Sequence, residues 1–131
     1  MASVRFERRI AAPADRVWSL VGDPARIVEW FPGVLEARVV GDRRTLRLAT
    51  GVEMPERILA ADARTRHFAY RLATDLVRFH LGTIDVFELG PSDTLVAYAT
   101  TAEPDTMALV IGGATDEALD AIVRLSEGAG G

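Results

Sequence analysis

The sequence predicts an α+β fold: a curved antiparallel sheet of about seven strands wrapped round a C-terminal helix, with two short helices between the first and second strands. Three observations lead to this prediction. A strand-like segment, Val4–Ile10, runs into two short helical patterns within residues 10–33. Alternating apolar and polar residues then recur in short segments separated by turns. The last segment changes to helical periodicity.

Prolines and an aspartate mark the starts of the two short helices. Pro13 suits a first helical turn, because the N–H that proline lacks would have no partner there. Asp23 precedes Pro24, and its carboxylate is placed to cap free N–H groups of a second helix, which Pro32-Gly33 ends. The apolar residues at helical spacing are Val17, Trp18, Leu20 and Val21 in the first helix and Ile27, Val28, Trp30 and Phe31 in the second.

Alternating segments after residue 33 are typical of strands joined by short turns. Turn residues such as Gly41-Asp42 and Gly90-Pro91 separate them, and their close spacing indicates an antiparallel meander. Pro55 lies inside one segment and argues for a sheet edge or a bulge near that point. The expected strands are residues 35–39, 45–48, 53–61, 67–72, 79–89 and 95–101.

The final segment is expected to form one amphipathic helix. Gly112-Gly113 lies inside its pattern and should weaken or bend it, although glycine there would also allow a close approach of backbone or ligand. From Gly128 onward we expect a frayed tail. The apolar side of the helix carries Met107, Val110, Ile111, Ala114, Ala118, Ala121, Ile122 and Leu125.

Composition narrows the function. The length of 131 residues fits one domain, residues 1–131. The chain has no cysteine and no lysine, which excludes disulfides, thiolate chemistry and Schiff bases. The net charge of −4 disfavours nucleic acid as a partner. With no signal peptide and no apolar run long enough for membrane insertion, we expect a cytoplasmic protein.

Five features follow one another along the chain: AAPADRVWSLVGDP, a tryptophan before the PGV turn, GDRRTLRLATG, PERILAAD and HLGTIDVFEL. Together they resemble the START-like (SRPBCC) polyketide cyclase/dehydrase superfamily, which has the helix-grip fold. The resemblance spans nearly the whole chain and implies an internal cavity for apolar or aromatic small molecules. Members include ligand carriers, lipid-transfer proteins, receptors and aromatic cyclases, so the resemblance does not imply one activity.

Two carboxyl groups are the candidates for chemistry. In the strand 79–89, Asp85 shares one face with Thr83, and His80 shares the other with Ile84, but both faces are partly apolar, so alternation does not decide which one lines the cavity. In an apolar cavity Asp85 would have a raised pKa and could act as a general acid or base; otherwise it is bonded to an arginine or to backbone N–H groups. Glu56 could likewise reach the cavity, or pair with an arginine such as Arg71 or Arg78.

The two histidines, His67 and His80, are expected to have structural or surface roles. Neither HxH nor HExxH spacing occurs, so the sequence predicts no metal site and no cofactor.

The predicted function is the binding of a hydrophobic or aromatic small molecule, such as a lipid, between the sheet and the C-terminal helix. One alternative is a polyketide cyclase/dehydratase-type enzyme that uses the cavity carboxyl groups of Asp85 or Glu56 with a tyrosine. A second alternative is a homodimeric interaction module with a collapsed cavity. The candidate ligand-binding residues are Trp30, Phe31, Tyr70, Asp85, Tyr98, Ile111 and Ile122.

Overall fold

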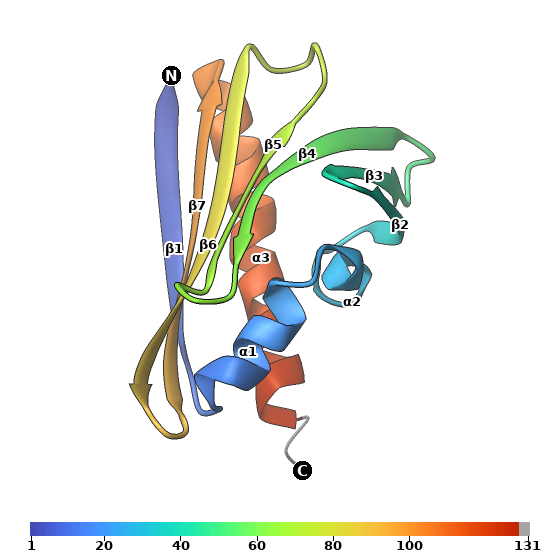
Figure 1. Ribbon diagram of the computed structural model, residues 1–131. Coiled ribbons are helices and arrows are strands. Elements are labelled where there is room, and N and C mark those ends of the chain that lie inside the picture. The colour runs from blue at the N-terminus through green and yellow to red at the C-terminus, as the bar shows by residue number, and fades with distance from the viewer. Residues whose placement is uncertain (129–131) are drawn as a thin grey trace.

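A computed structural model describes residues 1–128; of the tail predicted from Gly128 onward, Gly128 ends the last helix and the rest lies outside the described residues. It contains seven strands, a C-terminal helix and short helices between the first two strands (Figure 1). The strands are β1 (Ala2–Ile10), β2 (Val34–Val40), β3 (Arg43–Leu48), β4 (Glu53–Asp62), β5 (His67–Leu72), β6 (Phe79–Gly90) and β7 (Asp93–Glu103). The helices are α1 (Ala14–Val21), the 3₁₀ turn η1 (Pro24–Arg26), α2 (Ile27–Trp30) and α3 (Asp105–Gly128).

The strands form one antiparallel sheet in the order β1-β7-β6-β5-β4-β3-β2, which confirms the predicted α+β architecture. Consecutive strands from β2 to β7 pair as hairpins, and β1 pairs with the other edge of β7. The sheet curves strongly, and α3 crosses its inner side, where it packs mainly against β1 and β7 (Figure 1). Within residues 1–128 no helix is both long and apolar enough to cross a membrane.

The short helices begin where the sequence predicts. Pro13 precedes α1 in an extended conformation, and its carbonyl accepts the first helical hydrogen bonds, from Arg16 and Val17. The Asp23 carboxylate accepts from the Ala25 N–H at 3.0 Å and so caps η1, which has Pro24 in its first turn. The second helical pattern is therefore divided into a 3₁₀ turn and a single α-helical turn.

Pro55 does not mark an edge strand. It lies in β4, between β3 and β5, so the prediction of an edge is wrong. The Pro55 carbonyl accepts from the Ala73 N–H at 2.8 Å, and the nitrogen of a strand residue points to the same side as its carbonyl. Because β5 ends at Leu72, the missing N–H falls just beyond the last β4–β5 pair, at the end of the ladder rather than inside it. The β4–β5 register shifts farther along, between Ile58 and Ala60.

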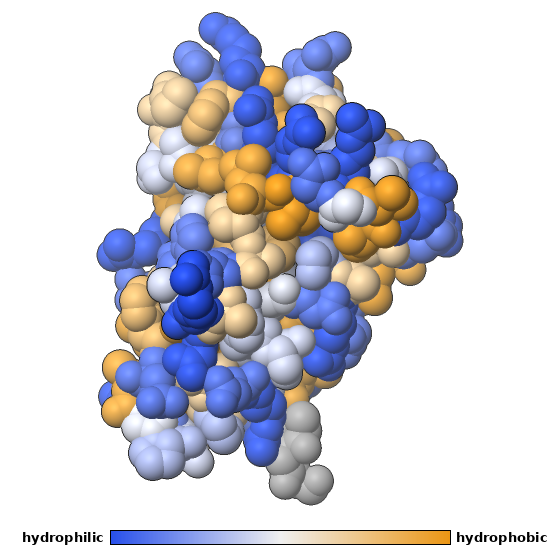
Figure 2. Space-filling model, viewed as in Figure 1, coloured by the Kyte–Doolittle hydropathy of each residue, from blue (hydrophilic) through white to orange (hydrophobic). Residues whose placement is uncertain are grey.

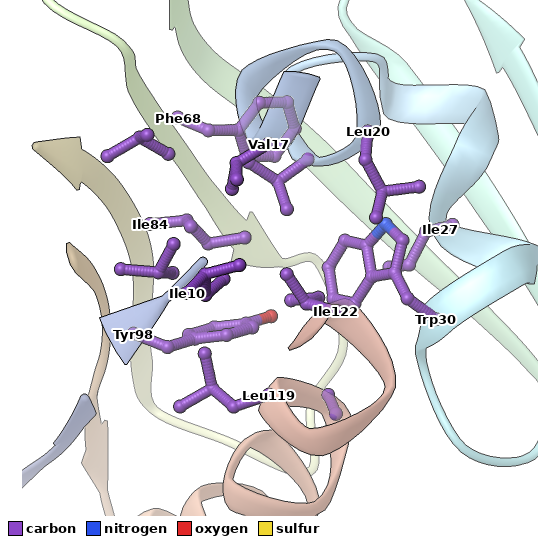
Figure 3. Close-up of a cluster of buried hydrophobic side chains, with 14 of the residues drawn as sticks. Ile10, Val17, Leu20, Ile27, Trp30, Phe68, Ile84, Tyr98, Leu119 and Ile122 are labelled. Carbon is purple, nitrogen blue, oxygen red and sulfur yellow. The ribbon is translucent and has the colours of Figure 1, made fainter. Parts of the chain in front are cut away.

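The hydrophobic core lies where α1, α2 and the C-terminal half of α3 meet the inner face of the sheet. Figure 3 shows the Trp30 indole beside Leu20 and Ile27, with Tyr98 and Ile122 next to them. These side chains are buried, so this end of the space between sheet and helix is packed solid.

The two adjacent glycines of α3 have different surroundings. The helix runs unbroken through both. Gly112 is buried against β1, and a β-carbon there would overlap the Val4 side chain, whereas a β-carbon at Gly113 would meet nothing within 4 Å. Gly112 thus lets α3 approach β1 closely, and Gly113 faces solvent.

We predict opposite effects for alanine at these two positions. Gly113→Ala should raise the free energy of unfolding by about 0.5–1 kcal/mol, because it removes glycine from an exposed helix interior. Gly112→Ala should lower it by about 1–2 kcal/mol, because stiff, branched Val4 must move. Urea denaturation of both variants measures the two values. Equal effects of the same sign would show that α3 does not rest on Val4.

Candidate functional site

A cavity of about 180 Å³ lies between α3 and the β2–β6 part of the sheet. Val110 contributes to its wall and is 67% exposed, so the cavity opens to solvent beside the first turns of α3. Figure 2 shows hydrophobic residues gathered on this face, over the region where Figure 1 labels β3 and β4. The apolar lining residues are Ile27, Phe31, Val34, Leu46, Leu48, Met54, Leu72, Val110, Ile111 and Ala114, and the polar ones are Glu56, Tyr70 and His80.

Glu56 forms a buried ion pair with Arg44. The two residues lie directly opposite each other on β4 and β3, and Arg44 Nε donates to Glu56 Oε1 at 2.7 Å. Arg44 Nη1 also donates to the Pro24 carbonyl at 3.0 Å, and its guanidinium lies 5.3 Å from the centre of the Tyr70 ring. Burial raises the pKa of Glu56 above its usual value, and the charge of Arg44 opposes that shift. The partner is therefore neither Arg71 nor Arg78.

Tyr70 and Tyr98 share one buried hydrogen bond. Their hydroxyl oxygens are 2.6 Å apart, and burial raises the pKa of both phenols. The Tyr70 ring occupies the place that a side chain at Gly82 would take, because a β-carbon there would lie 2.5 Å from Tyr70 Cζ. Both tyrosines thus remain neutral, and each hydroxyl already has a partner.

His80 lines the cavity from β6, next to Tyr70, with ring centres 5.4 Å apart. Its side chain lies just beyond the last β5–β6 pair, where Nδ1 accepts from the Leu72 N–H at 3.0 Å. Burial, with a smaller contribution from the charge of Arg71, lowers the pKa of His80 from 6.5 to about 4. The ring is therefore neutral at pH 7. Since Nδ1 accepts a hydrogen bond, the proton is on Nε2.

The candidate site residues lie in three places: on the cavity wall, in the packed core, and on the outer face of the sheet. Phe31, Tyr70, Ile111 and the catalytic candidate Glu56 lie on the cavity wall. Trp30, Tyr98 and Ile122 lie in the packed core beyond it (Figure 3). Trp30 and Tyr98 contact each other edge to face, with ring centres 6.1 Å apart.

Asp85 lies on the outer face of the sheet, contrary to its assignment to the cavity. His80, Gly82, Ile84 and Val86 are the buried residues of β6, so the alternation turns Asp85 the other way. Its carboxylate lies 2.6 Å from Nδ1 of His67, which is opposite it on β5. Both side chains are about one-third exposed, at 37% for His67 and 33% for Asp85.

Sequence reasoning expected a structural or surface role for His80 and did not count it among the ligand-binding candidates, whereas the structure places it among the residues that line the cavity. The sequence did contain an indication of this position, because His80 alternates in phase with Ile84 and Val86, which are buried. Alternation alone gave no way to choose between two partly apolar faces.

The curved sheet, the helix across it and the cavity between them define the helix-grip class of fold. Residues 1–127 match the family described as polyketide cyclase / dehydrase and lipid transport, and the chain belongs to this family. No curated protein matches the sequence.

Solved structures share the fold at low sequence identity. The protein XoxI from Bacillus cereus is 22% identical with a TM-score of 0.89, and the match covers 96% of each chain. A START superfamily protein from Mycobacterium smegmatis is 19% identical with a TM-score of 0.80, covering 97% of this chain and 98% of the other. Norcoclaurine synthase from Thalictrum flavum, a point mutant bound to a transition-state analogue, is 20% identical with a TM-score of 0.77, covering 99% and 96%.

We predict that acid weakens the fold through His80. The folded-state pKa of about 4 is lower than the value of 6.5 for a free histidine, so the unfolded chain binds the proton more tightly. The stabilising contribution is complete above pH 6.5 and is lost as the pH falls to about 4. At pH 5 the loss should be about 2 kcal/mol.

Urea denaturation of the wild type and of His80→Gln at pH 7 and pH 5 measures this loss. Glutamine can still accept from the Leu72 N–H but does not titrate, so the variant should lose less stability between the two pH values. Equal losses in the two proteins would contradict a buried neutral His80.

Proposed function

We propose that this protein binds a compact hydrophobic or aromatic small molecule in the cavity between α3 and the sheet. The observation that carries the proposal is the cavity itself, which is walled almost entirely by apolar side chains and open at Val110. Family membership and the START superfamily neighbour support the same kind of function.

The cavity volume limits the ligand to about one ring. At about 180 Å³ it is close to the roughly 150 Å³ of an engineered cavity that takes up benzene, and smaller than the roughly 300–1,000 Å³ of sites for drug-sized molecules. Burying an aromatic ring of roughly 150–250 Å² at about 25 cal/mol per Å² stabilises a complex by about 4–6 kcal/mol, which corresponds to a Kd on the order of 0.1 mM. A longer lipid-like chain would project through the opening.

We predict that a monocyclic aromatic compound binds in this cavity and that filling the cavity prevents binding. Ethylbenzene or acetophenone should shift the backbone amide signals of the lining residues saturably, with a Kd on the order of 0.1 mM. Ala114→Phe should weaken this binding at least about tenfold, because the new ring occupies the ligand's space.

Glu117→Phe is the matched control, because it adds the same ring to an exposed position of α3 outside the cavity wall. It should leave the Kd unchanged. The absence of saturable binding to the wild type at millimolar concentrations, or unchanged binding to Ala114→Phe, would overturn the proposal.

Proton-transfer catalysis of the cyclase/dehydratase type is a second candidate, and the position of Glu56 on the cavity wall favours it. The raised pKa of this carboxyl is suited to general acid or base work. The ion pair with Arg44 and the pairing of Tyr70 with Tyr98 leave fewer free groups than such an enzyme would use.

Exchange of the methyl protons of acetophenone into D₂O tests this candidate. If Glu56 removes a proton from bound ketone, the protein accelerates the exchange, and Glu56→Gln lowers the rate by about 10² or more while the Kd changes little. Proton NMR measures both quantities. Exchange no faster than in buffer, with acetophenone bound, would leave binding as the function.

A further inference from the structure

The strongest unexplained polar group in the cavity wall is His80 Nε2. His80 is 1% exposed, and within residues 1–128 no hydrogen-bond acceptor reaches this nitrogen. The Leu72 N–H holds the other ring nitrogen as an acceptor, so the Nε2 position carries the hydrogen. A buried donor without an acceptor has lost its hydrogen bonds to water, and a bound acceptor atom would restore one.

The other polar groups of the wall differ from His80 in this respect. The Tyr70 hydroxyl is paired with Tyr98, and the Leu72 N–H is paired with His80 itself. Glu56 is held by Arg44 and offers carboxyl oxygens rather than a fixed donor. His80 is therefore the lining residue whose buried N–H lacks a hydrogen-bond partner within residues 1–128.

The surroundings of His80 favour an uncharged acceptor. The ionisable side chains among the lining residues are Glu56, Tyr70 and His80, and none of them is a cation at neutral pH. Arg44 already neutralises Glu56 and does not line the cavity. A carboxylate ligand would therefore be desolvated near Glu56 with no positive partner, at a large cost, whereas a carbonyl oxygen would not.

We propose that His80 donates a hydrogen bond from Nε2 to the oxygen of the ligand, so that the cavity selects compact aromatic ketones, aldehydes and related uncharged carbonyl compounds over hydrocarbons of the same shape. This inference rests on the proposed binding function and specifies its ligand class. His80 is thus a specificity-determining residue.

Acetophenone and ethylbenzene test the inference, because they differ in little more than a carbonyl in place of a methylene. Titration calorimetry gives the ratio of their Kd values for the wild type and for His80→Phe. The ratio should shift about tenfold toward ethylbenzene in the variant, and comparing ratios cancels the different solvation of the two compounds in water. His80→Gln, which keeps an N–H donor, should restore part of the preference. Benzoate should bind the wild type more weakly than acetophenone.

A second measurement uses the wild type alone and does not depend on how well a variant folds. Long-range ¹H–¹⁵N spectra of the histidine rings should show His80 protonated on Nε2 without ligand. Acetophenone should move the Nε2–H signal saturably, with the Kd found by calorimetry, and ethylbenzene should move it much less.

Four results would overturn the inference, and they separate it from the proposed function. If both compounds bind in the cavity with the same ratio in wild type and His80→Phe, or if benzoate binds more tightly than acetophenone, the role of His80 is wrong and the binding function stands. If the free ring is protonated on Nδ1, the donor does not exist. If neither compound binds the wild type, the binding function fails, and the inference fails with it.

Discussion

The close contact between Gly112 and Val4 is the constraint on which the cavity depends. It sets α3 against β1 and β7, at one side of the sheet. Every strand that contributes to the cavity wall belongs to the other side, from β2 to β6. A straight helix cannot follow a strongly curved sheet across its whole width, so tight docking on β1 leaves the far strands without a helix to cover them. The cavity is the space that remains.

Buried polar pairs hold the far side of the sheet in place around this space. Arg44 links β3 to β4 through Glu56 and to η1 through the Pro24 carbonyl. Tyr70 spans the interior to reach Tyr98 on β7, and Gly82 leaves room for its ring. Such pairs cost desolvation, and their directional bonds fix which strands face each other. We therefore expect a wall whose shape changes little on ligand binding.

Sequence reasoning succeeded with local features and failed where a choice depended on neighbours. Within residues 1–128, periodicity located every strand, including β1 at the start, and the helix α3 at the end. Asp23 was placed correctly as a helix cap. The same alternation could not decide between Asp85 and His80, because each lies on a partly apolar face. Glu56 was expected either to reach the cavity or to form an ion pair with an arginine, but its partner Arg44 became evident only from the β3–β4 register. Pro55 was expected to mark a sheet edge or a bulge; the edge was wrong because the end of β5 was unknown, and the register shift of β4 lies between Ile58 and Ala60.

The amino-acid sequence by itself determined the α+β fold class, the order of its elements and the apolar character of the interior, because these follow from periodicity, capping and turn residues that act over a few positions. Only the tertiary structure decided which face of β6 is inside, how far α3 stands from each strand, and which buried polar atoms remain without a partner. These properties depend on the packing of residues distant in sequence. His80 shows the difference: its residue type and position were visible from the start, but its free N–H exists only because Leu72 occupies the opposite ring nitrogen.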